Sequence, residues 1–363
     1  AYTRFKDLQD AEARAKEGQI ELALERVRAR SLAMHHTSEL QEVANVLAQQ
    51  LLSIGIDING GVCIVINDEV KEDIPLWASS GMANYVQKVV VPFLDKPFFV
   101  KLRAAFKRRN HLYIEECSRA EKIELFNHLF KHEPWKLSTT KRKKELVDRE
   151  GGLSRSIAVS YYTSLAITDH FGKKFSNEEN EILKRFARVF EQAYTRFLDL
   201  QKAEAQAREA TIEASLERVR AMAMAMHSSK DLTESIQLFY AELQSLGVQP
   251  RRVGVALTHR ESKMAHLTTM STTEQGITRI VEGHLKMDGH WLLKEAFDHW
   301  VDQREFHAVL RGNEINEYYK IVRPQISYPE YPHDATQHGY YFMFPEGNVV
   351  AWTENELSEE ELR

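Results

Sequence analysis

Apolar positions between residues 177 and 226 recur at alternating spacings of four and three, a pattern that predicts one long helix with a coiled-coil seam. The segment contains no proline and is rich in Ala, Glu, Leu, Arg and Gln, residues that favour helix. The stripe begins with Phe186, Phe190, Ala193, Phe197 and Leu200. After Ala207 it changes phase, which we interpret as a torsional joint, and it resumes with Ile212, Leu216, Val219, Ala223 and Met226.

The long helix has a clear start at Ser176-Asn177-Glu178-Glu179, a capping box in which Ser and Glu side chains satisfy backbone N–H groups. Fifty helical residues would extend roughly 75 Å, so we expect this helix to connect two domains. Its stripe implies a partner helix, and we predict a parallel homodimer. The predicted dimer seam contains Phe186, Phe190, Phe197, Leu200, Leu216 and Val219. In the alternative interpretation, the helix packs on its own domains and does not dimerise.

A duplicated unit sets the domain organisation. Residues 1–40 return at 193–232 without a gap, with twenty-five of forty pairs identical, which indicates an internal repeat. We predict a connecting helix (1–36), a first domain (37–176), the long connecting helix (177–228) and a second domain (229–363). Because Ser358 begins another capping-box pattern, we expect the second domain to be truncated at the start of a helix in a longer protein.

Each domain opens with an amphipathic helix that ends at glycine, Gly55 or Gly247, and continues in short β-rich runs interrupted by helices. The predicted strands are 62–66, 74–78, 86–91, 111–115, 156–161, 164–168, 253–258, 266–270, 277–281, 306–310, 340–344 and 349–352. This order does not alternate regularly, so a doubly wound parallel sheet is disfavoured. We predict the α+β class, with two antiparallel sheets that each carry helices on both faces.

Composition narrows the function classes. A net charge of -5 over 363 residues gives no general attraction to nucleic acid or anionic membranes. No apolar run approaches the roughly 18 residues of a bilayer span, so we expect a cytoplasmic chain. The two cysteines, Cys63 and Cys117, fit a reducing compartment, and the histidine spacing predicts no metal site. The basic run 141–144 lies in an expected loop (131–152) and is interpreted as solvated surface, with attraction of an anionic ligand or nucleic acid as the alternative.

The ends of both predicted domains resemble the end of a GAF domain. The resemblance rests on Phe175-Ser176-Asn177-Glu178-Glu179 with the apolar residues after it, and residues 352–363 are similar. Two further segments, the repeated sequence Leu-Glu-Arg-Val-Arg-Ala and the Met-rich segment 222–226, resemble connecting helices of bacterial multidomain sensors. Such sensors are often histidine kinases of two-component systems. The resemblance implies tandem GAF-like domains with small-molecule pockets, a parallel dimeric bundle and an output domain elsewhere in the same chain.

Subfamily and catalytic signatures are absent from the sequence. It has no NKFDE-like run of cyclic-nucleotide-binding members, and Cys117 is followed by Ser118 instead of the His that accompanies a bilin-linked cysteine. It also has no phosphoacceptor box, Gly-rich ATP site or paired carboxylates, so we expect no enzymatic activity in this segment. The cofactor stays unknown at this stage.

Aromatic residues on the sheets and their covering helices are the candidate pocket lining. They are Trp77, Phe99, Tyr113, Phe126 and Tyr161 in the first domain and Trp291, Tyr318, Tyr340 and Phe342 in the second. In the second domain, prolines occupy the segment that corresponds to the expected loop (131–152) of the first domain. This difference indicates that the two pockets are not equivalent. We therefore predict a sensory module that binds a small ligand or partner. The alternatives are a structural spacer or interaction scaffold without a small ligand, and a redox or chromophore sensor that uses Cys63 or Cys117.

Overall fold

The computed structural model describes residues 2–80, 85–226, 229–272, 278–326, 328, 335–359, 361 and 362. The chain divides into two compact units, residues 1–204 (unit 1) and 205–363 (unit 2). Each unit contains one six-stranded antiparallel sheet, which confirms the predicted α+β class. No helix in the described ranges is both long and apolar enough to cross a bilayer.

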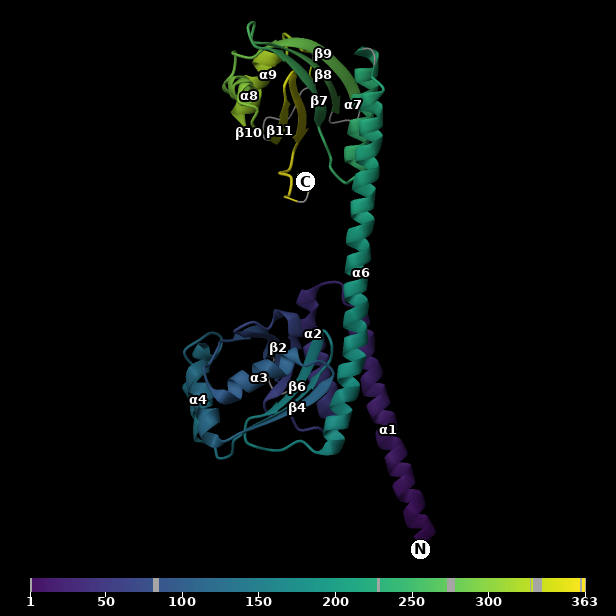
Figure 1. Ribbon diagram of the computed structural model, residues 1–363, viewed down its shortest axis with the longest axis vertical. Helices are drawn as coiled ribbons and strands as arrows, with labels where there is room; N and C mark the ends of the chain where they lie inside the picture. Colours follow the sequence, from purple (N-terminus) through teal and green to yellow (C-terminus); the bar gives the residue numbers. More distant parts are fainter. Residues whose placement is uncertain are drawn as a thin grey trace. The chain divides into compact units, whose positions relative to one another are not determined.

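Unit 1 is built on a sheet with the strand order β3-β2-β1-β6-β5-β4. The strands are β1 (Gly61–Ile66), β2 (Ile74–Ser80), β3 (Tyr85–Val91), β4 (His111–Cys117), β5 (Leu153–Val159) and β6 (Thr163–Asp169). On one face lie α1 (Tyr2–Leu32), α2 (Leu40–Ser53) and the first part of α6 (Asn177–Met224), and on the other lie α3 (Pro97–Lys107), α4 (Arg119–Leu129) and α5 (Thr140–Asp148) (Figure 1). Short 3-10 helices are η1 (Thr37–Glu39), η2 (Asn67–Glu69) and η3 (Trp135–Leu137).

Two local predictions have different outcomes. The capping box of α6 is confirmed, because Ser176 N–H donates to Glu179 Oε2 at 2.7 Å and Glu179 N–H donates to Ser176 Oγ at 3.1 Å. The loop predicted over residues 131–152 was wrong, since α5 forms inside it. Thr139 accepts a hydrogen bond from Arg142 N–H at 3.2 Å and thereby caps α5, while Leu146 is buried against the sheet side.

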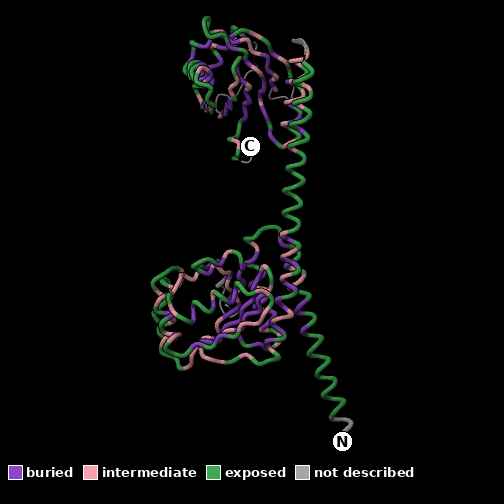
Figure 2. Tube along the Cα trace, viewed as in Figure 1, coloured by how far each residue is buried: buried purple, intermediate pink, exposed green. Residues whose placement is uncertain are grey.

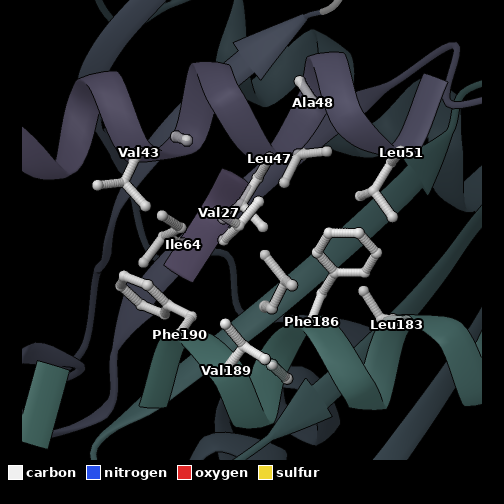
Figure 3. Close-up of a cluster of buried hydrophobic side chains, with 14 of the residues drawn as sticks. Val27, Val43, Leu47, Ala48, Leu51, Ile64, Leu183, Phe186, Val189 and Phe190 are labelled. Atoms are coloured by element: carbon white, nitrogen blue, oxygen red, sulfur yellow. The ribbon is translucent and has the colours of Figure 1, made fainter. Parts of the chain in front are cut away.

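The larger core of unit 1 lies between its sheet and α1, α2 and α6. Figure 3 shows side chains from α2, β1 and α6 converging, with Phe186 and Phe190 facing Leu47, Leu51 and Ile64. Phe190 is 0% exposed. Burial of such aromatic side chains is the main stabilisation that holds this part of α6 to the sheet.

Along this stretch, the apolar stripe of α6 is covered by α1, α2 and the sheet of the same chain. Lys16 of α1 pairs with Glu178 of α6 at 2.5 Å, and further along both helices Glu21 pairs with Arg185 at 2.6 Å, so α1 and α6 run in parallel. Phe186, Phe190 and Phe197 belong to the resulting core. The chain's own residues therefore cover these three positions of the predicted dimer seam. An apolar stripe can be buried by the core of its own domain as well as by a second chain.

Two of the three remaining seam positions are exposed. Leu200 is 50% exposed and Leu216 is 49% exposed, while Val219 is partly buried. Residues 6–19 of α1 and 199–211 of α6 are exposed throughout (Figure 2). The duplicated helices therefore differ in environment: Leu24 and Val27, the repeat equivalents of Leu216 and Val219, are buried in the unit 1 core.

Unit 2 has the sheet order β10-β11-β12-β7-β8-β9. Its strands are β7 (Arg252–His259), β8 (Met264–Thr272), β9 (Thr278–Lys286), β10 (Phe306–Arg311), β11 (Thr336–Phe344) and β12 (Gly347–Thr353). One face packs against α7 (Ser229–Ser245), and the other against α8 (Trp291–Val301) and α9 (Asn313–Val322). The α7 side buries few residues, and Leu257 and Phe342 on it stay partly exposed.

Candidate ligand cavity

A cavity of about 620 Å³ lies in unit 1 between the sheet and helices α3, α4 and α5. This volume falls within the range of small-molecule pockets. Its floor follows the alternation of a strand: Ile74, Leu76 and Ala78 of β2 line it, whereas Trp77 belongs to the core on the other face. The walls are apolar side chains of the covering helices, namely Phe99, Leu102, Phe106, Leu125, Phe126 and Leu129.

Charged groups gather at one end of the cavity. Arg155 of β5 stands opposite Thr168 of β6 in the register, and His170 follows directly after β6. Arg142 of α5 and Arg149, which directly follows α5, line the same end from the helices that cover the cavity. We call this group the cationic end (Arg142, Arg149, Arg155 and His170). The end is therefore assembled from the sheet and from the helix that the sequence analysis assigned to a loop.

His170 is held neutral in this setting. Burial, with the nearby positive charges of Arg142 and Arg155, lowers the pKa of His170 to about 3, against an opposing effect of Asp169. Its Nδ1 atom is buried and has no hydrogen-bond partner within the described part of the chain. An unpaired buried ring nitrogen is costly, which makes this atom available to a bound molecule.

Lys122 of α4 positions two members of the cationic end. Its side chain is fully buried, and Nζ donates to the Arg149 carbonyl at 3.0 Å and to the His170 carbonyl at 3.3 Å. Burial lowers the pKa of Lys122. These two hydrogen bonds join the end of α5 to the end of β6, so the cover and the floor are tied together beside the cavity.

Two cysteines lie near the cavity, and Cys63 lines it. Burial raises the pKa of Cys63 to about 11 and that of Cys117 to about 12. A thiol with a raised pKa stays protonated at neutral pH, and the thiolate is the reactive form. This environment disfavours the redox or chromophore alternative.

Alkylation should report these protonation states. At pH 8 we expect native Cys63 and Cys117 to react with iodoacetamide at least about tenfold more slowly than a free cysteine, with the Cys63 rate rising as the pH approaches 11. Mass spectrometry of timed samples measures the rates, and urea-unfolded protein is the control in which both thiols react. A native rate equal to the unfolded rate would contradict the assignment.

The predicted lining residues of unit 1 fall in four places. Phe99 and Phe126 line the cavity, and Trp77 packs in the core on the α2 side. Tyr113 of β4 is partly buried outside the lining, and burial together with Glu115 raises its pKa to about 12. Tyr161 is 54% exposed in the turn between β5 and β6.

The described residues of unit 2 enclose a small void of about 20 Å³ at the corresponding place, which is room for roughly one water molecule. Arg252, which is 2% exposed, fills the space. Its guanidinium lies 4.3 Å from the Tyr328 ring centroid and 4.9 Å from that of Trp352. Tyr318 lines the void, whereas Tyr340 and Phe342 face the α7 side of the sheet, and Trp291 is exposed at the start of α8.

The cationic end was not predicted from the sequence, although a signal for it was present. Arg142, Glu145 and Arg149 follow one another at spacings of three and four, which place them on one face of a helix. The basic run 141–144 overlaps this pattern, and it was interpreted by its charge instead of by its helical spacing. Within the described residues, no group of three or more His, Cys, Asp or Glu side chains could hold a metal ion.

Comparisons with known proteins leave the family open. No protein-family model matches the sequence, and no curated protein matches it. The crystal structure of a bacteriophytochrome from the photosynthetic bacterium R. palustris is similar over 93% of this chain and 62% of that chain, with 9% sequence identity and a TM-score of 0.34. This chain thus spans less than two thirds of that protein, and the likeness is too low to assign it a family or an activity.

Proposed function

We propose that this chain is a non-enzymatic sensory module of a signal-transduction protein, built from two GAF-like domains, in which unit 1 binds a small ligand. The observation that carries the proposal is the cavity of about 620 Å³ with a cationic end under α4 and α5. Antiparallel sheets with helices on both faces are in keeping with the GAF-like resemblance of the sequence. A structural spacer remains the second candidate for unit 2, because its core is filled.

The ligand signal would pass through helices in a parallel homodimer. The cavity cover and α6 belong to opposite faces of one sheet, so a shift of the sheet reaches α6 directly. A ligand can bias such a helix pair only through different affinities for its two arrangements. The exposed Leu200 and Leu216 supply apolar positions for a second copy of the chain.

Native mass spectrometry of the purified chain tests the function. We expect two copies per particle and a mass increment from a retained small molecule. Ala166 lies on the cavity floor, and Ala166→Phe should fill the cavity, so this variant should keep the dimer and lose the increment. A chain that binds no small molecule in any screen would contradict the ligand-binding role.

Dimerisation has its own test. Replacing Leu200 and Leu216 with Glu should raise the dissociation constant of the dimer by about tenfold or more, because a charge in an apolar helix seam must be desolvated. Sedimentation velocity over a concentration series measures the change. Leu137→Glu is the matched control, since Leu137 is exposed on the cover of unit 1 outside the connecting helices. Equal effects of the two substitutions would contradict the assigned seam.

A further inference from the structure

We propose that the unit 1 cavity selects small molecules that have an apolar body and one anionic group of the carboxylate class, with the anion bound at the cationic end. The inference rests on the proposed function, because it names the ligand class of the same cavity. Three features of the described residues support it: the charge balance of the lining, the order of side chains along the floor and the state of His170.

Counted with Glu115, which lies directly beside the lining, the charged side chains at this end of the cavity carry one excess positive charge. Arg142, Arg149 and Arg155 line the cavity together with a single carboxylate, Glu145. Arg142 pairs with Glu145 at 3.0 Å, and Arg155 pairs at 3.2 Å with Glu115, which is buried beside it.

Arg149 is the arginine of the lining that takes part in neither of these two ion pairs. Its guanidinium carbon lies 3.8 Å from the Phe171 ring centroid, and no carboxylate partner is found for it in the part of the chain that the structure describes. One anionic group on a ligand would complete the balance, whereas a molecule with several negative charges would bring surplus charge close to Glu145.

The sheet register separates the polar and apolar parts of the floor. Arg155 and Thr168 form one cross-strand row, and the next row inward contains Ile157 and Ala166. Further along, Val65 and Leu76 continue the floor with apolar side chains. A ligand that places its charge beside the first row must therefore place its remaining atoms on apolar surface, which favours an amphipathic molecule.

The neutral state of His170 agrees with this orientation. Burial, Arg142, Arg155 and Lys122 disfavour its protonated form, and Asp169 favours it. The ring centroids of Phe126 and His170 lie 5.2 Å apart, with the two ring planes nearly perpendicular. Burial is the largest cause of the neutral ring, and the positive charges that add to it also attract an anion. The buried Nδ1 atom adds a neutral hydrogen-bonding group at the same end.

Matched pairs of probes test the ligand class in the full chain. The pairs are 2-naphthoate with 2-naphthamide and octanoate with octanamide, each pair differing in charge and little in shape, and isothermal titration calorimetry gives the dissociation constants. We expect each carboxylate to bind about tenfold or more tightly than its amide. The preference should fall as the salt concentration rises.

Substitutions of opposite sign separate charge from structure. Arg149→Gln should weaken carboxylate binding by about tenfold, whereas Glu145→Gln should strengthen it, since the first removes a positive charge and the second a negative one. Neither should change amide binding by more than about twofold. Lys144→Gln is the control on α5, because Lys144 is exposed and outside the lining.

The outcomes are distinguishable. Stronger binding of the carboxylates with opposite shifts in the two variants supports the inference. Equal or stronger binding of the amides overturns it while leaving the proposed ligand-binding function in place. Binding of none of the four probes, together with no retained molecule in the native mass spectrum, overturns both.

Discussion

Phe190→Ala should lower the free energy of unfolding of unit 1 by about 4 kcal/mol, which is typical of truncating a fully buried aromatic side chain. Phe190 is 0% exposed and belongs to the cluster that joins α1, α2, α6 and the sheet. The substitution removes ring contacts and leaves a cavity that this rigid cluster can only partly close. Hydrogen-exchange mass spectrometry in increasing urea reports the stability of unit 1 peptides separately from those of unit 2.

Leu200→Ala is the matched control on the same helix. Leu200 is 50% exposed, and we expect its truncation to change the unfolding free energy of unit 1 by less than about 0.5 kcal/mol. If Phe190→Ala left unit 1 stable and only dissociated a dimer, Phe190 would belong to an interchain seam and its place in the intrachain core would be wrong.

Arg252→Ala should lower the free energy of unfolding of unit 2 by about 3 kcal/mol, because it removes both packed volume and cation–π contacts that are shielded from water. The guanidinium lies among the rings of Tyr318, Tyr319, Tyr328 and Trp352. Urea unfolding monitored by hydrogen exchange in unit 2 peptides measures the change.

Arg251→Ala separates this effect from a general loss of arginine. Arg251 is the neighbouring residue, and it pairs with Glu354 at the surface; such pairs contribute about 0–1 kcal/mol. Arg252→Ala also enlarges the void of about 20 Å³, so an apolar probe such as 2-naphthamide could enter unit 2 in that variant. A loss no larger than that of Arg251→Ala would contradict the packing role of Arg252.

The two units share one sheet architecture and differ in what fills the space beside the sheet. Both sheets have six antiparallel strands, yet unit 1 surrounds a ligand-sized cavity and unit 2 is filled by Arg252 and aromatic rings. The prolines of the second cover already indicated that the units differ. They could not indicate the filled core, because residue 252 and residue 352 meet only after β7 and β12 pair.

Several elements were predictable because their signals are local. The capping box at Ser176, the glycines at 55 and 247 and the strand alternation depend on neighbours within a few residues. Gly55 and Gly247 have φ of 85° and 92°, the left-handed conformation that ends a helix at low cost for glycine. Among the candidate pocket residues, Phe99 and Phe126 line the cavity, since both lie on the inward faces of α3 and α4.

The α+β class, the duplication and the long helix follow from residue order alone, because repeats, periodicity, caps and composition are visible in the chain before it folds. What covers each apolar stripe was settled by folding. Folding placed Phe186, Phe190 and Phe197 against the chain's own α1 and α2, and it brought the charged groups from α5, β5 and the end of β6 together. The physical reason is that a pattern shows which face of an element avoids water, whereas the identity of the covering surface depends on packing between residues far apart in the chain.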